Sequence, residues 1–242
     1  MSAEEMETLA ADGFVVCRQV VPLDRVERLR ECIADAVREE ALKPFGIRSL
    51  ASRCPEVGQL ARSEPIGQLV GQAIDGSFQL VRSILFDKLP GANWSVGWHQ
   101  DLSIAVKARS RNCPPNFRNW SEKDGVPHVQ APAELLGGMA TLRIHLDDAD
   151  TGNGPLLVIP GSHASGRLKS PEIDRWVGKN REVTCALKTG DILLMRPLIL
   201  HSSRRATPTE GSHRRVIHLE FAPTDGLPSE LEWFDDANSL RE

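Results

Sequence analysis

The chain has 242 residues, of which 40% are hydrophobic and 26% are charged, and it carries a formal net charge of −4 at pH 7. A chain of this size can bury one sizeable core, so we expect a single domain over residues 1–242. The acidic balance excludes the overall basic field that marks proteins binding nucleic acid. We therefore expect a small-molecule substrate and no nucleic-acid partner.

The cysteines and the N-terminal segment indicate the cellular compartment of the protein. The five cysteines are scattered and form no C-x-x-C pair, which fits reduced thiols in a cytoplasmic protein. No long uncharged apolar stretch is present, and the segment MSAEEMETLA is acidic where a signal peptide would be basic and then apolar. We expect a cytoplasmic protein with no membrane partner. The cysteines are Cys17, Cys32, Cys54, Cys113 and Cys185.

Residues 1–75 are expected to be largely helical. Apolar positions recur at helical spacing from about Glu4 to Ala41, which predicts two helices separated by the extended segment GFVVCRQVV. Asp24 is placed to cap the second helix, because its side-chain oxygen can accept a hydrogen bond from an amide of the first turn. A further helix is predicted from about Pro65 to Ile74.

Residues 78–221 have a different pattern, with short runs rich in β-branched and apolar residues separated by Gly, Pro, Asn and Asp. Several short strands with turn residues between them predict an antiparallel sandwich or barrel. The expected fold class is therefore mainly β with flanking helices. The runs are FQLVRSILF, WSVGWHQDLSIAV, MATLRIHL, PLLVIP, VTCAL, DILLMRPLILHSS and RRVIHLEFA.

Residues 107–136 interrupt the strand pattern and are expected to form an insertion or lid. The segment is long and contains several prolines, and such segments in compact domains are usually lids, binding loops or disordered insertions. Such basic residues more often form a solvated charged face; the other interpretation is an anionic substrate, such as a carboxylate or a phosphate-bearing thioester. His128 lies in this segment and is worth testing for a role. The basic residues are Lys107, Arg109, Arg111, Arg118 and Lys123.

A metal site is predicted from WHQDL and a distant histidine. On a strand, side chains two residues apart leave the same face, so His99 and Asp101 can meet one ion. His201, at the end of the run DILLMRPLIL, supplies a third ligand. Two imidazoles and one carboxylate on one face leave the opposite positions open for oxygen and a co-substrate, the arrangement of non-haem iron(II) oxygenases. The alternative is a buried, hydrogen-bonded trio.

Arginines on later strands are candidates for binding the far carboxylate of a dicarboxylate co-substrate. A planar guanidinium holds a carboxylate with two parallel hydrogen bonds. Alternation in HRRVIHLEF places Arg214 on the face of His218 and Glu220, and Arg215 on the other face. We favour Arg214 as the carboxylate clamp, with Arg215 as its competitor and a surface ion pair as the remaining interpretation.

Strand alternation also predicts whether the side chains of Arg143 and Lys88 point into the pocket or outward. The alternation in MATLRIHL turns Leu142 and Ile144 outward under the helices and Arg143 inward as a second pocket cation, unless Arg143 only neutralises a carboxylate such as Asp147. Lys88, in FDKLPG, precedes the metal-binding strand, and we interpret it as a solvated turn lysine in preference to an inward-pointing one.

The motifs WHQDL, LRIHLDDADTGNGPLLVIPGSH, GDILLMRPLILHSS and RRVIHLEF follow one another between Phe78 and Phe221. Together they resemble the phytanoyl-CoA dioxygenase family of Fe(II)- and 2-oxoglutarate-dependent oxygenases. The opening DGFVV, followed by an amphipathic helix, is also similar to that family. The resemblance implies a double-stranded β-helix, which is a cupin-like jelly roll.

The resemblance also implies roles for individual residues. It implies Fe(II) bound by His99, Asp101 and His201. It further implies 2-oxoglutarate held by Arg214, with help from the hydroxyl of Ser203. Related halogenases have a small residue in place of the carboxylate ligand, so the carboxylate present here implies hydroxylation or a related C–H oxidation. That reaction consumes molecular oxygen and releases succinate and CO2.

Two further positions gain an interpretation from the resemblance. Gln100 lies where the family places a residue against the co-substrate or the substrate. Arg143 lies where some relatives have an aromatic pocket wall, a departure that bears on this protein's own substrate.

Two rival functions remain open at the level of sequence. One is another metal-dependent jelly-roll enzyme that does not use 2-oxoglutarate, and it predicts no need for the Arg214 clamp. The other is a non-catalytic binding protein that keeps a metal for stability. The sequence predicts neither the identity of the substrate nor the oligomeric state.

Overall fold

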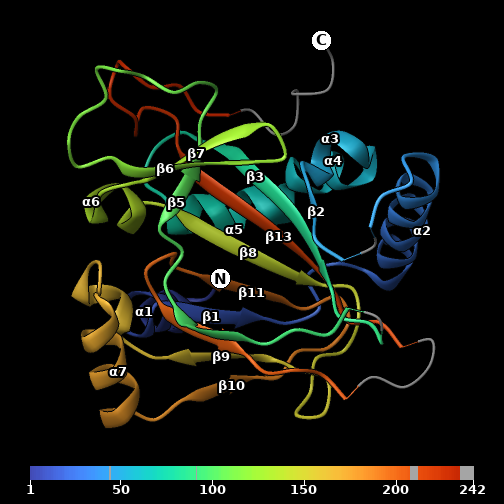
Figure 1. The fold of residues 1–242 in the computed structure, drawn as a ribbon. Coiled ribbons are helices and arrows are strands. Elements are labelled where there is room, and N and C mark those ends of the chain that lie inside the picture. The colour runs from blue at the N-terminus through green and yellow to red at the C-terminus, as the bar shows by residue number, and fades with distance from the viewer. Residues whose placement is uncertain (44, 91, 208–211, 235–242) are drawn as a thin grey trace.

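The core of the computed structural model, which describes residues 1–43, 45–90, 92–207 and 212–234, is built of antiparallel strands (Figure 1). The strands are β1 Phe14–Cys17, β2 Ile47–Arg48, β3 Phe78–Asp87, β4 Val96–His99, β5 Ser103–Ala105, β6 Arg118–Lys123, β7 Val126–Gln130, β8 Ala140–His145, β9 Leu156–Ile159, β10 Val183–Cys185, β11 Ile192–Met195, β12 Leu200–Ser203 and β13 Arg215–Pro223. The helices are α1 Ala3–Asp12, α2 Leu23–Glu39, α3 Leu50–Arg53, α4 Pro55–Ala61, α5 Glu64–Ala73, α6 Ala133–Gly137 and α7 Ser170–Lys179, with a short 3₁₀ turn η1 Ser162–Ser165.

The strands of the described residues form three sheets. The largest has six strands in the order β1-β11-β8-β13-β3-β2, and the second has four in the order β10-β9-β12-β4. A third sheet, in the order β5-β7-β6, belongs to the insertion. This arrangement confirms the predicted architecture, mainly β with flanking helices, and the three helices predicted in residues 1–75 are present as α1, α2 and α5.

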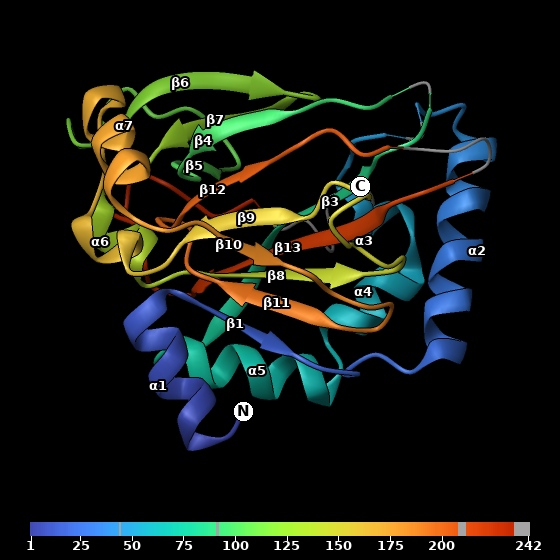
Figure 2. The ribbon, with the colours of Figure 1, turned by 90° about the horizontal axis from the view of Figure 1, so that it is seen from below.

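The N-terminal helices cover the outer face of the six-stranded sheet, and Figure 2 shows α1 and α5 below β1. Leu142 and Ile144 of β8 and Ile217 and Leu219 of β13 belong to one buried cluster with residues of all five of these helices. Ile217 lies opposite Ile144, and Leu219 lies opposite Leu142. The predicted alternation is therefore confirmed for both strands, and it turns their polar faces toward the four-stranded sheet.

The start of α2 differs from the prediction. The helix begins at Leu23, directly after Pro22, and no side chain caps it with a hydrogen bond. Asp24 already lies inside the first turn, where its carboxylate pairs with Arg28 one turn later at 2.8 Å. The predicted cap is therefore wrong, because the helix starts two residues earlier than a cap at Asp24 requires. No helix among the described residues is long and apolar enough to cross a membrane.

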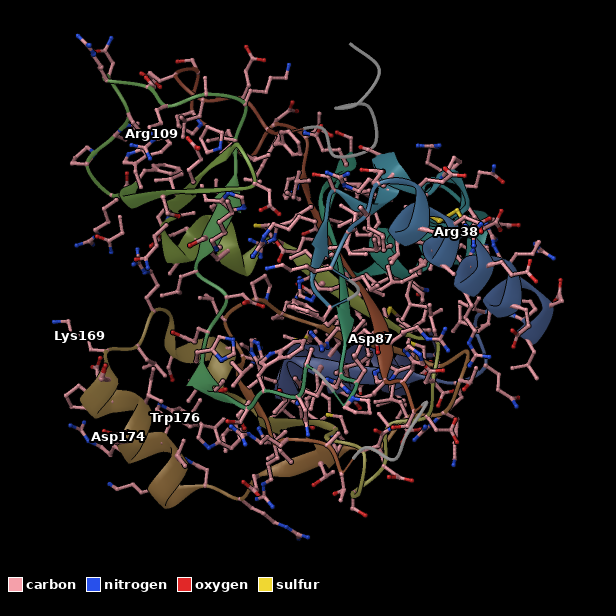
Figure 3. The ribbon with its side chains drawn as sticks, turned by 45° about the vertical axis from the view of Figure 1, so that its right-hand side comes forward. Arg38, Asp87, Arg109, Lys169, Asp174 and Trp176 are labelled. Atoms are coloured by element: carbon pink, nitrogen blue, oxygen red, sulfur yellow. A yellow bond between two sulfur atoms is a disulfide. The ribbon has the colours of Figure 1, made fainter. Side chains whose placement is uncertain are left out.

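The segment 107–136 contains a β-hairpin that the sequence analysis did not predict. Asp124 and Gly125 connect β6 to β7 with φ angles of 51° and 77°. A two-residue Asp-Gly turn with positive φ angles matches the twist of a hairpin, so the signal was present in the sequence. The hairpin packs on its own buried cluster with Trp233. The loop before β6 is peripheral, and Arg109 lies at the outer edge of the molecule (Figure 3).

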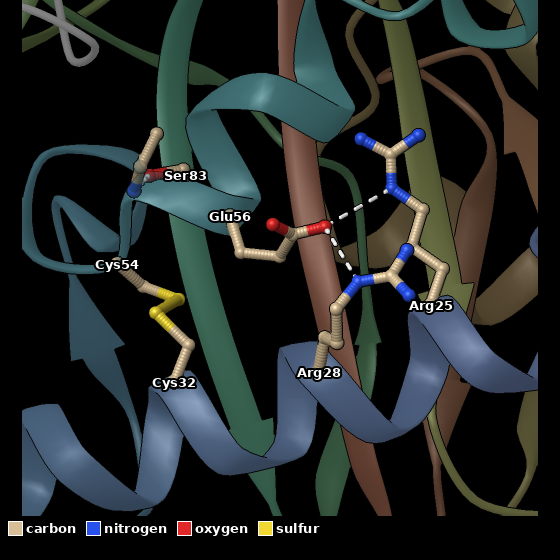
Figure 4. Close-up of a disulfide and its surroundings, with 7 residues drawn as sticks. Arg25, Arg28, Cys32, Cys54, Glu56 and Ser83 are labelled. Atoms are coloured by element: carbon tan, nitrogen blue, oxygen red, sulfur yellow. Dashed lines mark hydrogen bonds and ion pairs between the residues drawn. A yellow bond between two sulfur atoms is a disulfide. The ribbon is translucent and has the colours of Figure 1, made fainter.

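A disulfide joins two of the helical elements. Cys32 of α2 is bonded to Cys54, which lies between α3 and α4 (Figure 4). The expectation of five reduced thiols is wrong for this pair. The cause lies in the packing, since two residues 22 positions apart meet only when α2 and α4 come together. Glu56 strengthens the same junction through contacts with Arg25 and Arg28 at 3.3 and 3.7 Å. Cys17, Cys113 and Cys185 are free.

Candidate metal centre

Two neighbouring strands bring the three predicted ligands together. His201 of β12 lies opposite His99 of β4 in the antiparallel register, and their ring centroids are 4.2 Å apart. Asp101 follows β4, and its backbone N–H donates to the carbonyl oxygen of Pro197 at 2.9 Å. Its carboxylate lies 3.9 Å from Nε2 of His99 and 3.6 Å from Nε2 of His201. The three potential ligand atoms lie within 4.8 Å of one another.

Both histidines present the nitrogen that a metal requires. Nδ1 of His99 lies 2.8 Å from the carbonyl oxygen of Gly97, and Nδ1 of His201 lies 2.9 Å from that of Ile199. Because a carbonyl oxygen only accepts, each Nδ1 carries the proton and each Nε2 keeps its lone pair. Burial lowers the pKa of His201 from 6.5 to about 4, so its imidazole is neutral at pH 7. Metal-binding histidines are commonly oriented by this kind of backbone contact.

The Asp101 carboxylate is ionised and incompletely satisfied. Burial would raise its pKa, but the neighbouring His201, His218 and Arg82 hold that pKa below its usual range. Its Oδ2 is buried and has no hydrogen-bond partner among the described residues. Neutral imidazoles and a carboxylate are the ligand set of non-haem iron sites, and a divalent cation would satisfy all three groups. The residues present therefore fit the metal expected from the sequence.

Three buried cations line the cavity next to this cluster, which has a volume of about 100 Å³. Lys88, Arg143 and Arg214 are 1%, 6% and 2% exposed. Across the described part of the chain, none of the three belongs to a salt bridge, and both Nε atoms of the arginines lack a partner. An uncompensated buried charge costs several kcal/mol. A cavity with three such groups in its wall is therefore suited to an anion.

The adjacent Arg214 and Arg215 point in opposite directions. Arg215 donates from Nε and Nη2 to the two carboxylate oxygens of Asp147, each at 2.8 Å. Arg30 also contacts this carboxylate at 2.9 Å. Arg215 is thus held in an ion pair outside the cavity, while Arg214 lies in the cavity wall. The interpretation that Arg143 only neutralises Asp147 is wrong, since Asp147 is taken by the other two arginines.

Lys88 is not the solvated turn lysine that we expected. Its ammonium donates to Oγ of Ser203 at 3.2 Å and also to the carbonyl oxygen of Arg204. Burial, followed by repulsion from Arg214 and Arg143, lowers the pKa of Lys88 to about 8. The reason for the error is that β3 keeps its alternation up to the turn, so Lys88 continues the inward-facing series that β3 begins. Arg82, Ile84, Phe86 and Lys88 all line the cavity.

Ser203 and Gln100 lie in different surroundings. Ser203 lines the cavity beside Lys88, as the resemblance implies for a residue near the co-substrate. Gln100 is not part of the cavity wall; its amide nitrogen donates to the carbonyl oxygens of Gly166 and Leu198, and its oxygen accepts from the amide of Leu168. The contact of Gln100 with the co-substrate stays a prediction, and its hydrogen bonds favour a role in holding the segment that carries Asp101.

A chain of buried polar contacts crosses the cavity wall beside Asp101. Arg143 donates from Nη1 to Nδ1 of His218 at 3.1 Å, so the opposite nitrogen, Nε2, carries the proton donated to Glu220 at 2.8 Å. Glu220 also forms an ion pair with Arg82. Alternation had already placed His218 and Glu220 on the same face as Arg214, and all three residues are buried. Arg82 was missed because the alternation was not followed along β3.

The fold and the candidate site together define a class, a jelly roll with a two-histidine, one-carboxylate cluster at two neighbouring strands. Within that class, the family model described as phytanoyl-CoA dioxygenase (PhyH) matches residues 9–215. The chain therefore belongs to the phytanoyl-CoA dioxygenase family, which confirms the resemblance drawn from its motifs.

Individual relatives are distant. An ectoine dioxygenase of Bordetella parapertussis is 24% identical over 176 residues, which cover 67% of this chain and 50% of that protein. The peroxisomal phytanoyl-CoA dioxygenase of Mus musculus is 24% identical over 265 aligned positions, covering all of this chain and 74% of that protein. The chain thus spans about half the length of the ectoine dioxygenase that it matches.

A solved structure confirms the fold. The structure of EctD from S. alaskensis with 2-oxoglutarate and 5-hydroxyectoine superimposes with a TM-score of 0.72 at 16% identity, covering 96% of this chain and 80% of that one. The double-stranded β-helix implied by the motifs is therefore the fold of this chain.

Proposed function

We propose that this protein is an Fe(II)- and 2-oxoglutarate-dependent dioxygenase that hydroxylates, or otherwise oxidises at a C–H bond, a small molecule. His99, Asp101 and His201 are the proposed metal ligands. The observation that carries the proposal is the pairing of this cluster with a cavity lined by three buried cations that lack an ionic partner among the described residues. A metal site without a co-substrate would have no physical need for such cations.

The cations are proposed to bind the far carboxylate of 2-oxoglutarate. Arg214 is the clamp, because its guanidinium is in the cavity wall and uncommitted, whereas Arg215 is held by Asp147. Ser203 and Lys88 lie together and can donate to the same carboxylate. When bound, iron and 2-oxoglutarate supply the oxidising chemistry, in which oxygen converts the keto acid to succinate and CO2 and oxidises the substrate. The protein's own groups orient the reactants and keep water out.

Charge balance supports an anionic substrate. An iron(II), the Asp101 carboxylate and the keto-acid carboxylate of 2-oxoglutarate sum to zero charge. The far carboxylate then neutralises only one of Lys88, Arg143 and Arg214. The remaining positive charge favours a substrate with an acidic group. Asp101 in the ligand position supports hydroxylation, since it leaves no room for a halide ligand in its place.

We also propose that the protein works in the cytoplasm. The free thiols of Cys17, Cys113 and Cys185 support this compartment, whereas the bond between Cys32 and Cys54 counts against it. Fractionation of cells, followed by detection of the native protein, tests the location.

The function is tested by spectroscopy without oxygen. Fe(II) and 2-oxoglutarate added to the metal-free protein are expected to give a weak visible charge-transfer band, and substrate screening with oxygen is expected to release succinate. His201→Ala should lose both signals, and His163→Gln is the matched control because His163 does not line the metal cavity and its Nε2 lies 3.2 Å from the carbonyl oxygen of Ala10. A metal-loaded protein without the band would favour a jelly-roll enzyme that does not use 2-oxoglutarate. A band without succinate from any substrate would favour a binding protein.

A further inference from the structure

A second, smaller recess lies next to the metal cavity at the base of the β6–β7 hairpin. Its volume is about 10 Å³, and Arg82 is in the wall of both the recess and the metal cavity. Arg48 of β2 and Lys123 at the end of β6 line the recess with Arg82, and His128 of β7 completes this part of the wall. The proposed binding of iron and 2-oxoglutarate uses none of these four residues.

The cations of the recess repel one another and are incompletely neutralised. Burial and then repulsion by Arg82 lower the pKa values of both Arg48 and Lys123. Arg82 pairs with Glu220, and Nε of Arg48 lies 3.7 Å from Asp124, whose side chain is 65% exposed. Among the residues with described positions, no carboxylate lies within salt-bridge distance of Lys123. The recess therefore carries an excess of positive charge beside the metal cavity.

His128 gives a second, independent sign of a missing ligand. It is 2% exposed, and its Nδ1 lies 2.9 Å from the carbonyl oxygen of Val126, so Nδ1 carries the proton. Burial, with the surrounding cations, lowers the pKa of His128 to about 4, which leaves Nε2 as an unprotonated acceptor. Nε2 is buried and has no hydrogen-bond partner in the described part of the chain. Buried acceptors normally find a donor.

We propose that Arg48, Lys123 and His128 form a subsite for an oxyanion group of the substrate, a carboxylate or a phosphate, with a neighbouring O–H or N–H that donates to Nε2 of His128. The volume of about 10 Å³ admits about one water-sized group, so a single oxygen atom of the oxyanion enters the recess. The rest of the substrate extends past Arg82 toward Asp101. The inference rests on the proposed function for the oxidised end of the substrate, and it defines the substrate as a small oxyanion with an oxidisable C–H bond.

The subsite is tested with inorganic phosphate as the probe. Protein loaded with diamagnetic Zn(II) and saturated with 2-oxoglutarate, whose far carboxylate neutralises one cation of the metal cavity, is titrated while the ring nitrogens of His128 are followed by ¹H–¹⁵N NMR. We expect a saturable shift of this ring, weakened at least tenfold in Lys123→Met and in Arg48→Met and largely kept in Lys123→Arg. Arg111→Met is the matched control, since this exposed arginine of the same segment does not line the recess.

A parallel titration with acetate decides between the two oxyanions, because the tighter ligand identifies the group on the substrate. The absence of a saturable shift with either anion would overturn the proposal, as would equal affinity in wild type and Lys123→Met. If Lys123→Met does not fold, Arg48→Met and Lys123→Arg decide the matter. The charge-transfer band of the wild type separates failure of the proposed oxygenase function from failure of the proposed subsite. Loss of the band with a phosphate shift present contradicts only the oxygenase, and a band without a shift contradicts only the subsite.

Discussion

Replacement of Arg214 by methionine is expected to weaken 2-oxoglutarate binding and, at the same time, to stabilise the ligand-free protein. Arg214 is 2% exposed, and its Nε has no partner among the described residues. Its charge is therefore useful only when an anion is bound. Removal of one member of a buried, hydrogen-bonded charge pair costs about 2 kcal/mol or more. The dissociation constant of 2-oxoglutarate should accordingly rise by about 30-fold or more.

The gain in stability follows from the same burial. Burial, with repulsion from Arg143, lowers the pKa of Arg214 from 12.5 to about 10. A fall of that size disfavours the charged side chain in the folded state by about 3 kcal/mol, which is an upper bound for the gain. Methionine fills much of the same volume without the charge, so we expect the free energy of unfolding to rise by about 1 to 3 kcal/mol. For a chain of this size, each kcal/mol raises Tm by about 2 to 4 °C.

Arg215→Met is the matched control, one residue away on the opposite face. It removes both hydrogen bonds to Asp147, which are 2.8 Å long, and should destabilise the protein by about 1 to 3 kcal/mol. Its affinity for 2-oxoglutarate should remain that of the wild type. Calorimetric titration of Ni(II)-loaded protein and thermal unfolding of the ligand-free protein measure the two effects. Wild-type affinity in Arg214→Met, or lost affinity in Arg215→Met, would refute the assignment of the clamp.

Three other predictions concern Lys88, the disulfide and Gln100. Folding lowers the pKa of Lys88 from 10.5 to about 8, so between these pH values the unfolded chain binds more protons than the folded protein. The free energy of unfolding of the ligand-free protein should therefore rise as the pH increases over this range. Urea unfolding at pH 8 and pH 10 should show this rise in the wild type and not in Lys88→Met. Without reductant, three thiols of the denatured chain should react with a thiol reagent, and five reactive thiols would contradict the disulfide. Cys54→Ser should lower the free energy of unfolding by about 3 kcal/mol, because the disulfide joins residues 22 positions apart. Gln100→Leu removes the side-chain hydrogen bonds that hold the Asp101 segment and should weaken metal binding by about tenfold in a chelator competition, unless the backbone alone holds the segment.

Much of the fold followed from local rules. The period-2 pattern of MATLRIHL and RRVIHLEF predicted which face packs under the helices, and the buried cluster containing Leu142 and Ile217 confirms it. The N-terminal end of α2 was less predictable, since the observed cap position, Pro22, and the predicted one, Asp24, differ by only two residues. The hairpin of β6 and β7 was not predicted, although its Asp-Gly turn is a strong local signal. The prolines of the segment led instead to the prediction of an insertion or lid.

Strand alternation predicted the inward-facing residues of β8 and β13. The inward-facing residues at β3, Arg82 and Lys88, were not predicted because the same alternation was not extended to that strand. His99, Asp101 and His201 converge as expected, and alternation correctly separated Arg214 from Arg215. The disulfide between Cys32 and Cys54 could not be predicted from local sequence patterns. Its two cysteines have no characteristic spacing, and the pairing depends on how α2 packs against α4.

Strands β8 and β13 carry polar residues that line the cavity and, alternating with them, the apolar residues that hold the helices. On β8, Arg143 faces the cavity while Leu142 and Ile144 face the helices, and on β13 the inward His218 alternates with Ile217. A cavity with unpaired cations destabilises the ligand-free fold, so the outer apolar cluster must offset it. Substitutions in that cluster should therefore act differently on the two states. Loss of outer packing would unfold the ligand-free protein first, and co-substrate would rescue it, because binding neutralises charge at the opposite face of the same strands.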